Sequence, residues 1–403
     1  MKQNDVKTFY IYCKIHCPRR SLDSTRLYRY LVANGLKPVS DPQKAAFIFV
    51  ATCGGFALHE EFSLLTIEHA LKVKSESAKL VVTGCLTKIR PDALKAYNDI
   101  LVIHTADLDK LDSLIEAKVP YSTIAHSGTI EGVHDLYHGS FPQRIKRCIK
   151  SKDNFPKTLY FVFNKLLSAN NTPNKKWYRL EISRGCLNNC SYCAIKLAME
   201  KFHSLPESQI LENFKEGLKK GYTDFLVFGG DIGCYGVDIG TNLPMLLKKL
   251  FEINGRYQIR LADLNPHWFV KYYPELLSIF KANREKLEGV VIPLQSGSDR
   301  VLKLMKRNYK INEVKRCLLN LRRTFPDLYI ETHVMVGFPG ETDADFKKSL
   351  SVITQIQFSK VEIYKYEDRP GTAASYLPNK VTQAVINARV RILKSFVKSH
   401  VYT

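Results

Sequence analysis

Short apolar segments alternate with amphipathic segments along the first third of the chain. Four apolar segments have the length of strands, at residues 8–14, 45–52, 79–83 and 100–104. Between them, residues 22–35 and 60–74 carry apolar side chains at helical spacing, and Gly35 ends the first of these predicted helices. Strand and helix alternating with short connections predict a parallel, doubly wound α/β sheet.

A second series of strands and helices begins at Trp177 and has a longer period. Its predicted strands end near Arg184, Gly230, Asn265, Gln295, Gly337 and Tyr366. Each strand except the last is followed by a helical stretch, which predicts a partial (β/α)6 barrel with its chemistry at the carboxyl ends of the strands. Gly, Pro, Asn and Ser interrupt the segment between the two series. We therefore divide the chain into an N-terminal domain (1–125), a connector (126–175) and a barrel (176–403).

Composition narrows the class of protein. The chain has 403 residues, of which 45% are apolar, and this is enough for two hydrophobic cores. No apolar stretch of signal-peptide type opens the sequence, and the longest apolar run, Ala45–Ala51, is too short to span a bilayer. We expect a cytoplasmic protein with no membrane segment. In that compartment ten cysteines indicate metal ligation or redox chemistry rather than disulfides.

The charge balance favours a polyanionic partner. Sixty Lys and Arg residues against thirty-nine Asp and Glu residues give a formal net charge of +21. Nucleic acid or an acidic peptide would be attracted by this excess, although a solvated, lysine-rich surface is the plainer explanation. The densest basic stretch, Arg144–Lys152, lies in the predicted connector.

Three cysteines lie in one loop directly after a predicted strand. Cys186, Cys190 and Cys193 stand in the sequence EISRGCLNNCSYCAIK. At this spacing one loop can place three thiolates at three corners of a cubane iron–sulfur cluster. The fourth iron then stays open, and the amino and carboxylate groups of S-adenosylmethionine (SAM) can chelate it. A structural zinc site is the alternative, but it needs four ligands, and the nearest histidine is His203.

Three more cysteines follow predicted strands of the N-terminal sheet. Cys17 follows the first strand, Cys53 ends the second and Cys85 follows the third. The carboxyl ends of parallel strands share one edge of the sheet, so these thiols are expected to converge. Their spacing fits either a second cluster or three buried core cysteines. The remaining cysteines that we interpret as non-ligands are Cys148, Cys234 and Cys317.

Taken together, the motifs resemble those of the radical SAM methylthiotransferase family. The N-terminal cysteine motifs are HCPRRSLDS, VATCGGF and VVTGCLTK. The barrel motifs resemble the branch that modifies threonylcarbamoyladenosine in tRNA, and they read GGDIGCYGVDIGTNLPMLLKKL, IPLQSGSDRVLKLMKR, VGFPGETDADF and EDRPGTAAS. The resemblance covers residues 8 to about 395. It implies two [4Fe–4S] clusters, one on Cys186, Cys190 and Cys193 and the other on Cys17, Cys53 and Cys85.

The resemblance also implies which residues bind SAM. The family holds the SAM amino group with a Gly-Gly-Glu-like turn, and here Gly229, Gly230 and Asp231 occupy that turn. Tyr192 is expected to shield the cluster. The other residues expected to contact the ribose, adenine or carboxylate of SAM are Gln295, Ser296, Gly337, Phe338, Pro339 and Arg369.

Three positions depart from the family pattern. Cys13 competes with Cys17 as a cluster ligand, because CKIH also looks like the start of a family motif; the distance to Asp23 favours Cys17. Arg20 stands where the family usually has Asn, and His333 stands where the nearest branch has Asp. These departures point to a changed substrate.

The resemblance implies two stages that each use one SAM. In the first, a methyl group passes to a sulfur on the N-terminal cluster. In the second, SAM cleavage at the barrel cluster yields a radical that removes a substrate hydrogen, and the carbon radical takes up the methylthio group. An external electron donor of the flavodoxin or ferredoxin type would supply the reducing electron. Both open irons must then face one cavity, and positioning should dominate the catalysis.

The C-terminal part of the chain bears on the substrate. Members that act on tRNA end in an RNA-binding β-barrel, the TRAM domain, whereas residues 381–400 read as one helix and no strand-rich segment follows. We therefore expect no TRAM domain and favour an acidic substrate, a ribosomally made peptide or a protein segment. The alternative is a tRNA methylthiotransferase that acts on a modified adenosine beside the anticodon. A non-catalytic iron–sulfur protein is a further alternative, which the complete set of SAM motifs argues against.

Overall fold

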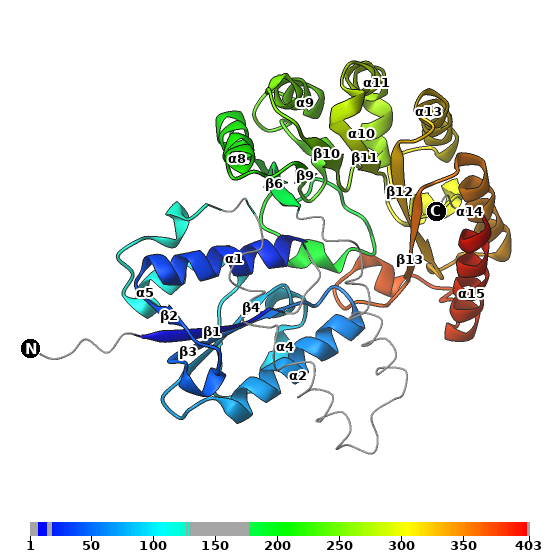
Figure 1. The fold of residues 1–403 in the computed structure, drawn as a ribbon. Helices are drawn as coiled ribbons and strands as arrows, with labels where there is room; N and C mark the ends of the chain where they lie inside the picture. Colours follow the sequence, from blue (N-terminus) through cyan, green and yellow to red (C-terminus); the bar gives the residue numbers. More distant parts are fainter. Residues whose placement is uncertain (1–6, 14–17, 126–127, 129–176, 401–403) are drawn as a thin grey trace, which may run out of the picture.

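The computed structural model describes residues 7–13, 18–125, 128 and 177–400. Cys17, Cys148 and the basic stretch at residues 144–152 lie outside the described residues, and so does the side chain of Arg20. Figure 1 shows two units, each built on its own sheet, that contact one another. Among the described helices, none combines the length and the apolar character needed to traverse a bilayer.

The N-terminal unit is a five-stranded parallel sheet with the strand order β2-β1-β3-β4-β5. Its strands are β1 (Thr8–Cys13), β2 (Lys37–Pro38), β3 (Phe47–Thr52), β4 (Lys79–Gly84) and β5 (Leu101–Val102). Its helices are α1 (Pro18–Ala33), α2 (Ala57–Val73), α3 (Leu86–Ile89), α4 (Pro91–Leu94) and α5 (Leu111–Ile115), with the 3-10 helices η1 (Pro42–Lys44), η2 (Thr105–Lys110) and η3 (Tyr121–Thr123). The predicted fourth strand is shorter than expected, because only Leu101–Val102 pair with β4.

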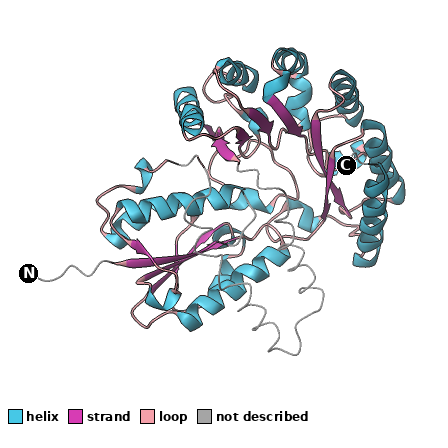
Figure 2. Cartoon of the chain, in the orientation of Figure 1, coloured by secondary structure: helices cyan, strands magenta, loops and turns pink. Residues whose placement is uncertain are grey.

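Both faces of this sheet are covered. Successive residues of a strand point to opposite faces, and in β1 Phe9 and Ile11 join the core cluster that contains Leu27 of α1. Tyr10 belongs to the opposite cluster together with Ile67 of α2. The predicted doubly wound sheet is therefore confirmed (Figure 2).

The C-terminal unit is a six-stranded parallel sheet with the order β13-β12-β11-β10-β9-β6. Its strands are β6 (Tyr178–Glu181), β9 (Asp224–Phe228), β10 (Gln258–Leu261), β11 (Leu287–Val291), β12 (Tyr329–Val336) and β13 (Lys360–Lys365). A small hairpin of β7 (Ser183–Arg184) and β8 (His203–Ser204) follows β6. The two edge strands, β6 and β13, do not pair with each other, so the predicted partial barrel is confirmed.

Helices line the outside of this open barrel (Figure 1). They are α8 (Glu207–Lys219), α9 (Leu243–Glu252), α10 (Pro266–Lys271), α11 (Tyr273–Ala282), α12 (Asp299–Leu304), α13 (Ile311–Thr324), α14 (Asp343–Ile356) and α15 (Gln383–His400), with the 3-10 helices η5 (Ala194–Ala198), η6 (Ile232–Cys234), η7 (Arg284–Lys286) and η8 (Ala373–Tyr376). One continuous apolar core joins the strands to these helices. Helix α15 agrees with the helix expected near the end of the chain.

Candidate active site

The barrel cysteine loop, residues 186–193, leaves the sheet at Gly185. This glycine has φ +70°, a conformation that disfavours residues with a side chain. A Cβ at this position would also lie only 2.7 Å from the carbonyl oxygen of Glu200, so the backbone passes too close to residue 200 for any residue other than glycine. Cys186, Cys190 and Cys193 are half-buried. Burial raises the pKa of the Cys193 thiol to about 11, and a thiolate at this position therefore needs compensating positive charge.

Two polar side chains that sequence analysis missed hold the sulfurs of this loop. The amide nitrogen Nδ2 of Asn188 donates to Sγ of Cys186 at 3.2 Å, and Nη1 of Arg307 lies 3.5 Å from Sγ of Cys190. Hydrogen bonds to sulfur and nearby positive charge are what an iron–sulfur site uses to stabilise its thiolates. Within the described residues no three His, Cys, Asp or Glu side chains converge on a single metal ion. A cubane cluster does not need three side chains to converge on one ion, because each thiolate binds a different iron.

The Gly-Gly-Asp turn after β9 packs directly on the cysteine loop. A Cβ at Gly230 would lie 1.8 Å from the carbonyl oxygen of Gly185, and one at Gly229 would lie 2.6 Å from Oγ of Ser183. The glycines therefore permit two backbone segments to touch. Their predicted contact with the SAM amino group remains a prediction.

The carboxylate of Asp231 has four protein donors and is only 2% exposed. The donors are Nδ2 of Asn188 at 2.6 Å, the backbone nitrogens of Gly233 at 3.0 Å and Asn265 at 3.2 Å, and Sγ of Cys234 at 3.4 Å. Burial raises the pKa of Asp231, while these hydrogen bonds oppose the shift. The observed contacts tie Asp231 to the cysteine loop through Asn188.

Gln295 has features of a ligand-binding residue. Its φ of +65° is unusual for a residue with a side chain, and the strained conformation is fixed by backbone hydrogen bonds to β12. Oε1 of Gln295 is buried and has no hydrogen-bond partner in the described structure. A buried, unpaired amide oxygen suits a donor group on a bound molecule. Ser296 next to it accepts from the backbone nitrogen of Ser298 at 3.2 Å.

The loop after β12 contacts the cysteine loop through aromatic rings. Phe338 is fully buried and meets Tyr192 edge-on, with ring centroids 6.4 Å apart. Oε2 of Glu341 accepts from the backbone nitrogen of Gly337 at 2.7 Å and from Nη1 of Arg389 at 2.8 Å. Glu341 and Arg389 thus order the loop that carries Gly337, Phe338 and Pro339.

Two of the three N-terminal cysteines meet at the contact between the units. Cys53 and Cys85 are 7% and 4% exposed, and they share one buried cluster with Ile89 and with Ala194 and Ala198 of η5. Ala194 directly follows Cys193, so this cluster joins both cysteine sets. A Cβ at Gly84 would lie 2.1 Å from the carbonyl oxygen of Thr52, which shows how closely the ends of β3 and β4 approach.

A histidine that the sequence analysis did not predict lies beside Cys53. Nδ1 of His59, in the first turn of α2, lies 3.6 Å from Sγ of Cys53. Cys13 ends β1 and packs against the core cluster under α1, not in the cluster of Cys53 and Cys85. The choice between Cys13 and Cys17 remains open, since Cys17 is not described.

Arg369 contacts the N-terminal unit, and its expected contact with SAM stays a prediction. Its guanidinium is 5% exposed and contacts the N-terminal unit, where it pairs with Glu60 and donates to the carbonyl oxygen of Gly54 at 2.7 Å. No pattern in the sequence predicts these partners, which lie more than three hundred positions earlier.

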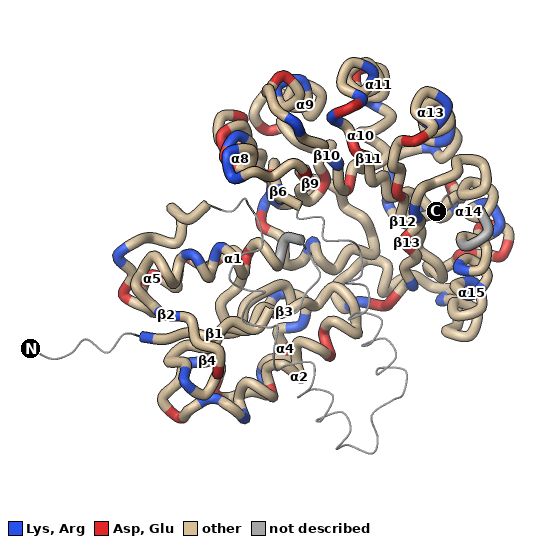
Figure 3. Tube along the Cα trace, viewed as in Figure 1, with Lys and Arg blue, Asp and Glu red and all other residues tan. Residues whose placement is uncertain are grey.

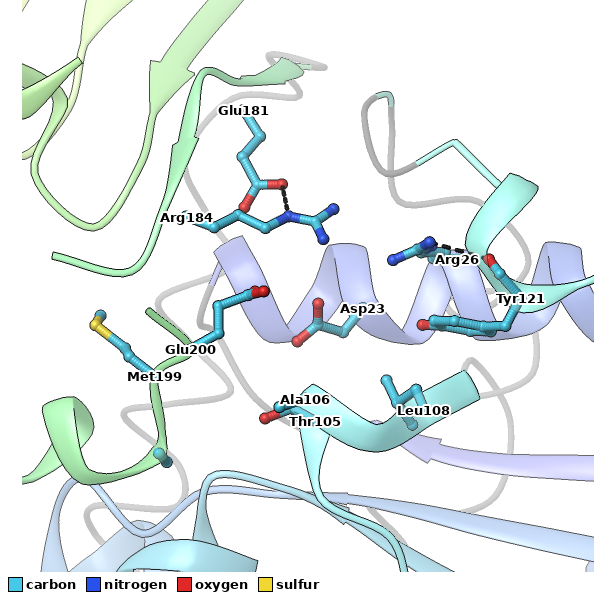
Figure 4. A pocket seen from close by; sticks show the side chains of 11 residues that line it. Asp23, Arg26, Thr105, Ala106, Leu108, Tyr121, Glu181, Arg184, Met199 and Glu200 are labelled. Carbon is cyan, nitrogen blue, oxygen red and sulfur yellow. Dashed lines mark hydrogen bonds and ion pairs between the residues drawn. The ribbon is translucent and has the colours of Figure 1, made fainter. Parts of the chain in front are cut away.

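A pocket lies between the two units, lined by α1 and η2 on one side and by residues 181–184 and 198–200 on the other (Figure 4). Nε of Arg184 contacts Oε2 of Glu181 at 3.0 Å on one wall, and Nη2 of Arg26 donates to the carbonyl oxygen of Tyr121 on the other. The lining residues are Asp23, Arg26, Thr105, Ala106, Leu108, Tyr121, Glu181, Arg184, Ala198, Met199 and Glu200. Its acidic and basic side chains nearly balance, so it has no strong preference for an anion.

Comparison with known proteins identifies both units. The Radical SAM superfamily model matches residues 180–353, and the model described as Uncharacterized protein family UPF0004 matches residues 11–104. The threonylcarbamoyladenosine tRNA methylthiotransferase MtaB of Thermotoga maritima is 31% identical over 355 residues, which cover 88% of this chain and 74% of the relative. The ribosomal protein uS12 methylthiotransferase RimO of Chlamydia pneumoniae is 27% identical over 399 residues, 96% of this chain and 78% of the relative.

A solved structure supports the same fold. The radical SAM methyltransferase TsrM from Kitasatospora setae, with cobalamin and a [4Fe–4S] cluster bound, superimposes with a TM-score of 0.59 over 92% of this chain and 76% of that chain. At 12% sequence identity this likeness concerns the fold alone.

Proposed function

Because this chain belongs to the radical SAM methylthiotransferase family, we propose that it attaches a methylthio group to a tRNA nucleoside, a modified adenosine beside the anticodon. A C–H bond of the substrate is replaced by a C–S bond, and the hydrogen leaves on 5′-deoxyadenosine. A second SAM supplies the methyl group. An external donor of the flavodoxin or ferredoxin type supplies electrons.

The expectation of a peptide substrate has less support than its alternative. The relatives described above are named for tRNA and for a ribosomal protein, and the one named for tRNA shares the higher identity. A ribosomally made precursor peptide finds no support in these names. The net charge of +21 suits tRNA equally well, and Figure 3 shows Lys and Arg distributed over both units.

Membership of the family implies SAM and a [4Fe–4S] cluster. We assign the barrel cluster to Cys186, Cys190 and Cys193, and an auxiliary cluster to Cys17, Cys53 and Cys85. When bound, these groups supply the radical and sulfur chemistry. The protein residues hold the sulfurs, through Asn188 and Arg307 at the barrel, and exclude water with Tyr192 and Phe338. The buried Oε1 of Gln295, which has no partner among the described residues, would accept a hydrogen bond from SAM.

One observation carries the two-cluster proposal. Cys53 and Cys85 pack against Ala194 and Ala198, the residues that follow the last cysteine of the barrel loop. Methylthio transfer needs the sulfur and the substrate radical within reach of each other, and an arrangement in which both cysteine sets border one contact satisfies this need.

Aromatic side chains at the same contact support a nucleobase as substrate. Phe56, three residues after Cys53, stacks on Tyr364 of β13 with ring centroids 5.9 Å apart and an interplanar angle of 10°. His333 meets Tyr364 edge-on at 5.4 Å. A base that stacks on such rings gains about 1–3 kcal/mol. The basic surface would hold the phosphates, while the aromatic group would select the base.

The experiment that tests the proposal uses anaerobically reconstituted protein with SAM, dithionite and unmodified or precursor tRNA. We expect about eight irons per chain, a methylthio nucleoside in the digested tRNA, and both 5′-deoxyadenosine and S-adenosylhomocysteine. Binding of tRNA should weaken steeply between about 50 and 200 mM salt. About four irons per chain, or 5′-deoxyadenosine without S-adenosylhomocysteine, would contradict methylthio transfer. Modification of a protein segment with tRNA left unchanged would reject the substrate alone.

A further inference from the structure

A short segment after β13 contacts both cysteine loops at once. At its start, Nη2 of Arg369 donates to the carbonyl oxygen of Gly54, which directly follows Cys53, and the same nitrogen pairs with Oε2 of Glu60 in α2. Arg369 and Glu60 are 5% and 8% exposed. A carboxylate of the same segment, Oε2 of Glu367, accepts from the backbone nitrogen of Ala57 at 2.7 Å. The segment is therefore fixed to the loop and helix that follow Cys53.

The other end of this segment is fixed to the barrel cysteine loop. The backbone nitrogen of Ala374 donates at 2.8 Å to the carbonyl oxygen of Ser191, which lies between Cys190 and Cys193. A tight turn joins the two ends, because Oγ1 of Thr372 donates to the carbonyl oxygen of Arg369 at 2.8 Å. Gly371 in this turn packs against Leu197 of η5. Residues 367–374 thus form a short brace between the cysteine sets.

The ion pairing extends to the third cysteine loop. Oε1 of Glu60 contacts Nη1 of Arg90 at 2.7 Å, and Arg90 follows the helix that begins after Cys85. Glu60 therefore links Arg90, five residues after Cys85, to Arg369 of the barrel unit. Burying ions has a desolvation cost that often cancels their attraction, so such a triad is a poor source of stability. It does favour one arrangement of the segments, since separating Arg369 from Glu60 would leave two buried charges without their partner.

We propose that Arg369 is a positioning residue that sets the separation and orientation of the N-terminal cysteine set relative to the barrel cysteine set. The inference rests on the proposed function, because the separation matters only if both sets serve one reaction. Geometry also explains the residue type. One nitrogen of the guanidinium, Nη2, donates to both a carboxylate and a carbonyl oxygen, and the planar group fixes the direction of these donors more firmly than the flexible ammonium of a lysine would.

Loss of the brace should uncouple SAM cleavage from methylthio transfer. A misplacement of about 1 Å between reacting groups can cost about 100-fold in rate. Loss of the brace leaves the barrel loop with its own ligands, so SAM cleavage continues. The substrate radical then meets the sulfur less often. The ratio of methylthio product to 5′-deoxyadenosine therefore falls.

The test compares Arg369→Met with Arg260→Met in reconstituted protein. Arg260 is a matched control, because it also forms a partly buried ion pair, with Glu288, but lies on β10 and contacts neither cysteine loop. In Arg369→Met, hydrogen exchange of peptides covering residues 54–60 and 191–198 should rise about tenfold or more, and the product ratio should fall about tenfold. Arg369→Lys should lie between this variant and the wild type. In Arg260→Met neither quantity should change.

Two outcomes overturn the proposal. The first is wild-type exchange at both cysteine loops in Arg369→Met. The second is a loss of 5′-deoxyadenosine in proportion to product, which would indicate damage to the barrel site rather than uncoupling. If Arg369→Met fails to fold, Arg369→Lys carries the same comparison. If the wild-type protein forms no methylthio product, the proposed function fails, and the exchange of the two loops still decides whether Arg369 braces them.

Discussion

The barrel loop collects its three cysteines within residues 186–193, whereas the N-terminal unit must bring its cysteines from the ends of separate strands. The barrel set depends on local geometry, namely the Gly185 crossing and the contacts of Asn188 and Arg307. The N-terminal set depends on the parallel order of β1, β3 and β4 and on the contact with the other unit. The barrel set can bind a cluster whenever its loop is formed, whereas the N-terminal set needs the whole fold.

The largest effect should come from removing one thiol of each set. We expect Cys190→Ala to abolish both 5′-deoxyadenosine and methylthio product, because the barrel cluster loses a ligand. Cys53→Ala should lower methylthio product by about a thousandfold or more while SAM cleavage persists, because sulfur transfer alone depends on that set. Product analysis by liquid chromatography and iron counts would measure both.

The matched control for these variants is Cys317→Ala. Cys317 is half-buried on α13 and packs against the barrel core away from both loops. The Cys317→Ala variant should retain the iron content and the product ratio of the wild type. If Cys53→Ala retained full methylthio product, the proposed difference in role between the two sets would be wrong.

An intermediate effect is expected at Asp231, which the barrel loop needs for its shape. Asp231→Asn replaces one acceptor oxygen by an NH2 group, so at least one of four buried donors loses its partner at a cost of about 1–3 kcal/mol. Asn188 should then hold Cys186 less firmly. We expect the barrel cluster to lose iron to a chelator about ten times faster, with the N-terminal cluster unchanged.

Asp238→Asn offers the comparison for this variant. Asp238 lies on the same loop and accepts from the backbone nitrogen and hydroxyl of Ser204, yet it has no hydrogen bond to the cysteine loop among the described contacts. Spectra of the reduced clusters would separate the two sites. Equal iron loss from both clusters in Asp231→Asn would mean that the residue stabilises the whole fold and not the loop.

Sequence patterns predicted the surroundings of the barrel cysteines more completely than those of the N-terminal cysteines. The strands of the barrel were predicted from apolar runs that alternate with helical stretches, and the turn of Gly229 and Gly230 packs against the start of the cysteine loop. The convergence of Cys53 and Cys85 followed from parallel topology alone. The partners of Arg369 could not be predicted, because the contact of Arg369 with Glu60 depends on how the two units dock, and neither periodicity nor spacing encodes docking.

We expect the smallest effect at Asp345, which joins two barrel loops. It should appear in the free energy of unfolding. Although burial opposes ionisation, hydrogen bonds from Arg300, Ser298 and Thr342 hold the pKa of Asp345 well below its ordinary value. A folded-state pKa below the unfolded one of about 4 contributes stability at neutral pH that is lost as the pH falls through the folded value. Asp345→Asn should therefore lower the free energy of unfolding by about 1–2 kcal/mol at pH 7, and the difference from wild type should narrow below about pH 4.

Urea unfolding of the cluster-free chains at pH 7 and at pH 3 measures this difference. The control is Asp327→Asn, whose carboxylate is 79% exposed in its pair with Arg284 and should contribute little at either pH. Because Asp345 caps α14 and binds Ser298 next to the strained Gln295, its loss should disturb the barrel unit and leave the sheet around Cys53 and Cys85 intact. A pH-independent difference would show that the charge is unimportant and that shape alone holds the two loops together.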